Sequence, residues 1–156
     1  MSKNLLALVK SDLLAAKDKD PAARNLLEIF FTYSGFHAIL LYRICHIIWN
    51  FKLKFVAKFL SNFARILTSV EIHPAAKINE GFFIDHGAGL VIGETCEIGK
   101  NVTLYQQTTL GGISPAIDSN AQRNIKRHPT VEDNVIIGSG AQILGPVKIG
   151  KNSRIA

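Results

Sequence analysis

The sequence has little cysteine and no long apolar run. Its two cysteines, Cys45 and Cys96, lie far apart without a Cys-x-x-Cys spacing, which argues against a disulfide framework or a cysteine-ligated zinc site and favours a reducing compartment. The longest uncharged apolar stretch, 29–42, has 14 residues and is too short to span a bilayer. The N-terminus lacks the apolar core and cleavage site of a signal peptide. We therefore expect a cytoplasmic protein without a membrane-spanning segment.

Acidic residues are scarce in the first half of the chain. Residues 1–70 contain ten Lys/Arg and four Asp/Glu, whereas residues 71–156 contain eight of each, so the net charge of +6 belongs to the first half. The basic stretch FKLKFVAK (51–58) is typical of the polar stripe of a packed helix. Because no aromatic or glycine-rich nucleic-acid motif accompanies these charges, we expect neither a nucleic-acid nor a membrane partner.

Residues 3–67 have the apolar spacing of helices, with hydrophobic residues three and four positions apart. Asp20-Pro21 has the form of a helix start, and YSG at 33–35 interrupts the pattern before a second long helix from about Phe36. We assign residues 1–69 to a helical oligomerisation segment.

From residue 70 onwards the sequence follows a period of six. Aliphatic residues recur at this spacing in three phases: Ile72, Ile78, Ile84; Ile92, Ile98, Leu104, Leu110; and Val131, Ile137, Ile143, Ile149, Ile155. Such a period is typical of the hexapeptide repeat, in which each hexad forms one side of a prism and three hexads make a coil. We predict an α+β protein in which residues 70–156 form a left-handed parallel β-helix of about four coils.

The breaks in phase predict where the chain leaves the prism. The spacing from Ile84 to Ile92 is eight, so two residues bulge out near HGAG. The spacing from Leu110 to Val131 is 21, which predicts an excursion loop at about 111–128.

Polar residues at the prism corners are candidates for chemistry. Glu71 precedes the first side of coil one and His86 ends its third side, so a closed coil places both at one corner, about 4.8 Å apart. A carboxylate there can orient the imidazole while the other ring nitrogen takes a proton. Arg127 and His128 lie on a different edge, within reach of His86 only from a neighbouring prism. A lone corner histidine is otherwise usually a turn residue, and His73 is interpreted as structural.

Five motifs, in their order along the chain, resemble those of bacterial serine O-acetyltransferases: EIHP, IDHG, GET, TLGG and RHP. The similarity runs from about Asp18 to the end. The resemblance implies transfer of acetyl from acetyl-CoA to the hydroxyl of L-serine, giving O-acetylserine in cysteine biosynthesis. It also implies acetyl-CoA as co-substrate, no bound cofactor, no metal and no protein nucleophile.

The resemblance assigns roles by motif. It implies that His86 is the general base and Glu71 its carboxylate partner. The residues implied to hold the substrate amino acid are Asp20, Asp85, Arg127 and His128. Those implied to line the CoA groove are Gly111, Gly112 and Ser139.

The resemblance further implies a homotrimer, with a dimer of trimers as the alternative. The loop at 111–128 is longer than is usual in the family. The sequence ends within the hexad array, whereas family members continue with another coil and a tail that docks into cysteine synthase. We therefore expect cysteine synthase as a partner only if the full-length product has that tail.

Three other functions remain open from the residues. The chain could be a related CoA-dependent O-acyltransferase acting on another acceptor, or a truncated, non-catalytic trimeric scaffold. A γ-type carbonic anhydrase would place zinc on His73, His86 and His128, but the close histidine pair usual there, five residues apart, is missing.

Overall fold

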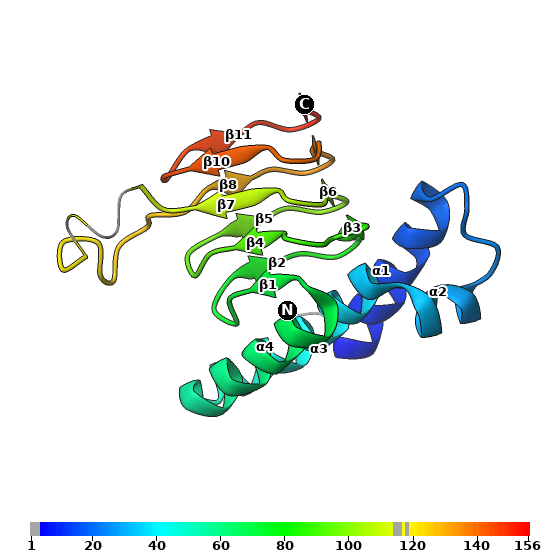
Figure 1. Cartoon of the computed structure of the whole chain (residues 1–156), viewed down its shortest axis with the longest axis horizontal. Helices are drawn as coiled ribbons and strands as arrows, with labels where there is room; N and C mark the ends of the chain where they lie inside the picture. The colour runs from blue at the N-terminus through cyan, green and yellow to red at the C-terminus, as the bar shows by residue number, and fades with distance from the viewer. Residues whose placement is uncertain (1–3, 114–116, 118) are drawn as a thin grey trace.

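The computed structural model describes residues 4–113, 117 and 119–156. Within these residues, four helices come first: α1 (Leu5–Lys19), α2 (Leu26–Thr32), α3 (Ser34–Asn50) and α4 (Lys54–Thr68). Short strands follow: β1 (Glu71–Ile72), β2 (Lys77–Ile78), β3 (Phe83–Asp85), β4 (Val91–Ile92), β5 (Glu97–Ile98), β6 (Thr103–Tyr105), β7 (Thr109–Gly111), β8 (Thr130–Val131), β9 (Ile136–Ile137), β10 (Gln142–Leu144), β11 (Lys148–Ile149) and β12 (Arg154–Ile155). Figure 1 shows the strands stacked in a column, with the helices gathered around the first coil and the C-terminus at the far end.

The strands form three parallel sheets, each built from every third strand: β1-β4-β7-β10, β2-β5-β8-β11 and β3-β6-β9-β12. Each coil therefore contributes one strand to each side of a prism. The register pairs the predicted inward positions, as in Ile72 with Ile92 and Ile92 with Leu110. The predicted fold is confirmed: a helical segment followed by a left-handed parallel β-helix of hexapeptide repeats.

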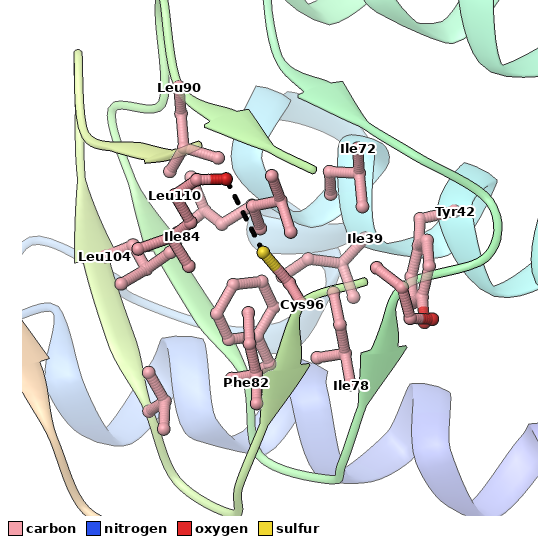
Figure 2. Close-up of a cluster of buried hydrophobic side chains, with 14 of the residues drawn as sticks. Ile39, Tyr42, Ile72, Ile78, Phe82, Ile84, Leu90, Cys96, Leu104 and Leu110 are labelled. Carbon is pink, nitrogen blue, oxygen red and sulfur yellow. Dashed lines mark hydrogen bonds between the residues drawn. The ribbon is translucent and has the colours of Figure 1, made fainter. Parts of the chain in front are cut away.

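The inward aliphatic side chains fill the prism. Ile92, Ile98, Leu104 and Leu110 are at most 1% exposed. Figure 2 shows Leu104 and Leu110 in one cluster with side chains of the first coil and of α3. The thiol of Cys96 donates a hydrogen bond to the carbonyl of Leu110 at 3.5 Å. Burial of this continuous apolar column provides the main stabilisation of the fold.

A buried ion pair attaches the helices to the first coil. Oδ2 of Asp12 in α1 lies 3.1 Å from Nη2 of Arg43 in α3, and both side chains are almost fully buried. Arg43 also donates to the carbonyl of Asn79 at 2.6 Å, and Asp12 accepts from the backbone N–H of Phe82 at 3.0 Å. These bonds satisfy both charges, so α1 and α3 hold a defined position against the prism.

One local prediction about the helices is wrong. Asp20-Pro21 does not start a helix, because α1 continues to Lys19 and Asp20 caps its C-terminus. The next helix instead begins after Asn25, whose side chain accepts from the N–H of Glu28 at 2.9 Å. The predicted second long helix is α3, which begins at Ser34, and α4 follows it after Lys52, which adopts a left-handed φ of 67°.

Two further observations bear on the predicted segments. No helix within the described ranges is long and apolar enough to cross a membrane. Residues 1–3 of the helical segment, and residues 114–116 and 118 of the predicted excursion, lie outside the described residues.

Candidate functional site

A cavity of about 280 Å³ lies where α1 ends, α3 begins and β3 ends. Its lining includes Asp20, Tyr33, Ser34, Asp85 and His86, which come from three separate segments of the chain. The sequence predicted functions for three of these residues, and the fold brings all three to one cavity.

The backbone at the end of β3 presents the imidazole of His86 to solvent. His86 has a left-handed φ of 60° directly after the strand, and its side chain is 76% exposed. Its Nε2 lies 3.8 Å from Oδ1 of Asp85, and its carbonyl accepts a hydrogen bond from Ser34 at 3.3 Å. The ring is therefore available to a ligand while its backbone is held in place.

Close contact between α3 and β3 shapes this cavity. A Cβ at Gly35 would lie 2.2 Å from the carbonyl oxygen of Ile84, so only glycine allows the helix to begin against the strand. This contact sets the position of Ser34 and Tyr33 relative to His86.

Asp20 is held in place before any ligand binds. The hydroxyl of Tyr33 donates to Oδ2 of Asp20 at 2.6 Å, and the N–H of Ala22 donates to Oδ1 at 2.8 Å. The hydrogen bond to Asp20 is the main cause that raises the pKa of Tyr33 to about 12, so this phenol remains a donor at neutral pH. Asp85 lines the same cavity, so two carboxylates border it, which suits a cationic group such as an ammonium.

The backbone of Glu71 lies close to the segment that follows His86, but its side chain forms an ion pair with Arg65. The N–H of Glu71 donates to the carbonyl of Leu90 at 2.9 Å, close to the turn that follows His86. Its carboxylate, however, lies 3.4 Å from Arg65 of α4, and no ion pair joins it to His86 in the described part of the chain. The partnership of Glu71 with His86 stays a prediction.

Arg127 and His128 form a second cluster on another corner of the prism. The guanidinium of Arg127 makes a short ion pair with Glu94. Burial, the largest single influence, disfavours the charged form of Glu94, but the hydrogen bond to Arg127 and the charges of His73, Arg127 and Lys58 together lower the pKa of Glu94. His128 is 8% exposed, and burial lowers its pKa.

His73 belongs to the same cluster, although the sequence pointed to a structural role. Burial lowers its pKa to about 4, and the charges of Glu94, Lys58, Arg127 and His128 also act on it. The sequence analysis also missed Glu94. The available signal was the GET motif, which lies one coil beyond the His73 turn on the same prism corner.

The predicted CoA-groove residues are divided between the two corners. A Cβ at Gly112 would lie 3.8 Å from Nε2 of His128, so Gly111 and Gly112 belong to the second corner. Ser139 is exposed and lies above the His86 turn, two coils further along the prism. The N–H of Gln107 donates to the carbonyl of Ala88 at 2.9 Å, and the N–H of Gly140 donates to the carbonyl of Gln106 at 3.0 Å, so the three turns stack.

Within one chain the two clusters do not meet. In Figure 1 the described residues that lead into β8, from 119 onwards, lie to the left of the prism, whereas α2 lies to the right. No group of three or more His, Cys, Asp or Glu side chains in the described residues is arranged to hold a metal ion.

Comparison with known proteins gives matches at both ends of the chain. The family described as "Serine acetyltransferase, N-terminal" matches residues 1–40, and "Bacterial transferase hexapeptide (six repeats)" matches residues 128–156. A serine acetyltransferase of Bacillus licheniformis is 48% identical over 148 residues, covering 95% of this chain and 65% of the relative. One from Staphylococcus aureus is 46% identical over 151 residues, covering 97% of this chain and 67% of the relative.

Solved structures give the same result. A serine acetyltransferase in complex with cysteine has a TM-score of 0.89 at 38% identity, covering 96% of this chain and 59% of that one. A serine acetyltransferase in complex with CoA has a TM-score of 0.88 at 38% identity, covering 97% and 60%. The Neisseria gonorrhoeae enzyme in complex with serine has a TM-score of 0.88 at 36% identity, covering 96% and 58%. The chain thus spans about two thirds of the length of the curated relatives that it matches.

Proposed function

The chain belongs to the serine acetyltransferase family, and from this premise we propose that the protein transfers the acetyl group of acetyl-CoA to the hydroxyl oxygen of L-serine. Acetyl-CoA is a co-substrate here, and no bound cofactor takes part. The observation that carries the proposal is the division of complementary groups between two prism corners. One corner has carboxylates and an exposed imidazole, and the other has a guanidinium and a buried imidazole.

The two corners together match the polar groups of an amino acid. The carboxylates of Asp20 and Asp85 suit the ammonium group of serine, and the guanidinium of Arg127 suits its carboxylate. Tyr33 already orients Asp20, and Glu94 already orients Arg127. Groups that are ordered before binding lose less conformational entropy when the ligand arrives.

His86 acts as the general base in this proposal. Its imidazole takes the proton of the serine hydroxyl as the oxygen attacks the thioester carbonyl carbon. The C–S bond then breaks, and the sulfur of CoA takes the proton back from the imidazolium, which leaves O-acetylserine and CoA. A positioned base of this kind contributes about 10²–10⁴-fold to the rate, and holding both reactants in one cleft contributes more.

Glu71 stabilises the imidazolium in the same step. Its ion pair with Arg65 is about half exposed on both sides, and such pairs contribute only about 0–1 kcal/mol. Little therefore opposes a movement of the Glu71 carboxylate from Arg65 towards His86.

Because the two corners are separate within one chain, a complete site requires a second protomer. We infer that a complete site joins His86 of one protomer to Arg127 and His128 of its neighbour. A homotrimer of prisms around a threefold axis meets this requirement with identical interfaces, and a dimer of trimers is the alternative. Gly111, Gly112 and Ser139, which are divided between the same two corners, would then flank CoA between neighbouring prisms.

Helix α4 supports an oligomerisation role for residues 1–69. Its buried positions are Ala57, Ala64 and Thr68. The opposite face carries Phe55, Phe59 and Phe63, which are 82%, 64% and 53% exposed. At 150–250 Å² per ring, these side chains expose roughly 300–500 Å² of apolar surface, as much as the largest patch on a typical monomer. Another edge of α4 lines the cavity that contains Glu71, so an interface on this face would continue to the site.

We propose that the reaction takes place in the cytoplasm. Both cysteines are free and buried, as expected for a protein kept in a reducing compartment.

Thiol release from acetyl-CoA, measured with and without L-serine, tests the proposed function. We expect serine-dependent release that falls about 10²–10⁴-fold in His86→Asn. Asparagine is chosen because it tolerates the left-handed φ of this position. His37→Asn is the matched control, because His37 bonds to the carbonyl of Phe30 outside both corners.

Three outcomes would contradict the proposal. A fully active His86→Asn variant would show that His86 is not the general base. Release with another hydroxyl compound but not with serine would indicate a related O-acyltransferase. An intact trimer that fails to bind acetyl-CoA in calorimetry would indicate a scaffold.

A further inference from the structure

The segment Gly93–Glu94–Thr95 follows β4 and lies directly against Arg127 and His128. A Cβ at Gly93 would lie 2.0 Å from Cδ2 and 2.1 Å from Nε2 of His128. The absence of a side chain at Gly93 therefore lets the imidazole rest on the backbone at this corner.

Thr95 makes four hydrogen bonds to Arg127 and His128. Its hydroxyl oxygen accepts from the backbone N–H of Arg127 and from that of His128, both at 3.0 Å. Its own backbone N–H lies 3.2 Å from Nδ1 of His128, and its hydroxyl lies 2.9 Å from the same atom.

The direction of these bonds fixes the protonation of the ring. A backbone N–H can only donate, so Nδ1 of His128 must be the acceptor and carries no proton. The hydroxyl oxygen of Thr95 already accepts two bonds, which leaves its proton for Nδ1. The neutral ring therefore carries its proton on Nε2.

The Nε2 atom of His128 is open to a ligand. It makes no hydrogen bond to another described residue. Among these residues, Oε1 of Gln106 is the one fully buried side-chain polar atom without a partner, so Nε2 of His128 is not fully buried. It lies near Gly112, where a Cβ would be 3.8 Å away. An N–H group in this position suits an anionic oxygen.

We propose that Thr95 is a positioning residue that holds His128 as the neutral Nε2–H tautomer, so that His128 donates a hydrogen bond to the carboxylate of the acceptor amino acid. The ligand part of this inference rests on the proposed function, whereas the tautomer does not. Glu94 forms an ion pair with Arg127, and Thr95 bonds to His128. The GET motif therefore orients the RHP motif.

Charges around His128 act in both directions. Arg127 and Lys126 disfavour the imidazolium and Glu94 favours it, while His73 lies close enough to interact with it. Burial is the largest influence and also disfavours the charged ring. Protonation of Nδ1 would in addition break both bonds from Thr95, so the environment and the hydrogen bonds favour the same neutral form.

Nitrogen-15 NMR of the histidine rings in the whole protein tests the tautomer without serine or acetyl-CoA. The signals of His128 are assigned by their loss in His128→Gln. We expect an unprotonated Nδ1 and a protonated Nε2 between pH 6 and pH 8 in the wild type and in Thr95→Ser. In Thr95→Val, which keeps the shape and the backbone N–H but loses the hydroxyl, we expect the same tautomer and a pKa of His128 closer to the ordinary value of 6.5, because one of the two bonds to Nδ1 is lost.

Kinetics then tests the ligand. Thr95→Val should raise the KM for L-serine about tenfold, the effect of losing about one hydrogen bond, while kcat changes less and Thr95→Ser stays near the wild type. A protonated Nδ1 in the wild type would overturn the proposal even if Thr95→Val failed to fold. An unchanged pKa of His128 in Thr95→Val would overturn it as well. A neutral Nε2–H tautomer in a protein without serine-dependent turnover would instead contradict the proposed function alone.

Discussion

At the scale of single residues, the environment gives three histidines of one prism different chemistry. His86 stands at a left-handed φ with its ring exposed, which suits a base that exchanges protons with a ligand. His128 is buried, with Nδ1 fixed by Thr95, which suits a donor. His73 packs edge-on against Trp49, with ring centroids 5.2 Å apart, and remains neutral. Sequence spacing does not distinguish these three roles, because they depend on burial and on hydrogen-bond partners.

His73 makes stability depend on pH. Burial lowers its pKa from 6.5 to about 4, so between these values the unfolded chain binds more protons than the folded one. This contribution to stability is complete above pH 6.5 and is lost as the pH falls towards 4. Nδ1 of His73 accepts from the N–H of Ala75 at 3.1 Å, a turn that asparagine can reproduce without titrating.

We therefore expect the wild type to lose about 1–2 kcal/mol more unfolding free energy than His73→Asn between pH 7 and pH 5. Urea unfolding at the two pH values measures this difference. Equal losses in the two proteins would show that His73 is protonated normally in the folded state.

At the scale of elements, the junction between α3 and β3 determines the geometry of the acidic cavity. Ser34 and Tyr33 reach His86 and Asp20 because Gly35 lets the helix start in contact with the strand. The junction is further fixed by the buried Asp12–Arg43 pair. Helix position and site geometry are thus coupled.

Gly35→Ala should disturb this junction. The new Cβ would lie 2.2 Å from a backbone oxygen, so α3 must shift, and we expect a loss of about 1–3 kcal/mol of unfolding free energy together with a raised KM for serine. Denaturant unfolding and serine titration measure the two effects. Gly150→Ala is the control, because its Cβ would meet only the Ser153 hydroxyl at 4.0 Å. Equal stability of the two variants would contradict the tight junction.

At the scale of the whole molecule, the two corners of the prism require a partner copy. One corner carries Asp20, Asp85 and His86, and the other carries Arg127 and His128. The exposed phenylalanine face of α4 provides apolar surface for such contact. The oligomer is therefore part of the proposed site and more than a source of stability.

Mixing two inactive variants tests the shared site. His86→Asn and Arg127→Gln should each be nearly inactive alone. After joint refolding in equal amounts, about a quarter of the sites in a randomly mixed symmetric oligomer join an intact His86 to an intact Arg127. We expect recovery of turnover at about that level, measured by thiol release. A mixture as inactive as its components would place the whole site within one chain.

The period-six pattern by itself determined most of the fold. It predicted a three-sided prism, because each inward position needs an aliphatic side chain in a narrow column. The register then stacks Ile72, Ile92, Leu110 and Ile143 on one side and Ile84, Leu104, Ile137 and Ile155 on another. The helix boundaries were predicted less well. Asp20-Pro21 has the same local signal whether a helix starts there or ends there.

The sequence also determined which residues are candidates for the site, since the motifs name His86, Asp85, Arg127 and His128 directly. Only the tertiary structure decided how they are grouped. It placed Asp20 beside Asp85, left Glu71 paired with Arg65, and gave Glu94 and Thr95 the task of orienting Arg127 and His128. The physical reason is that a repeat specifies the order of sides around a prism, whereas ion pairs and ring tautomers depend on which side chains meet across coils and helices.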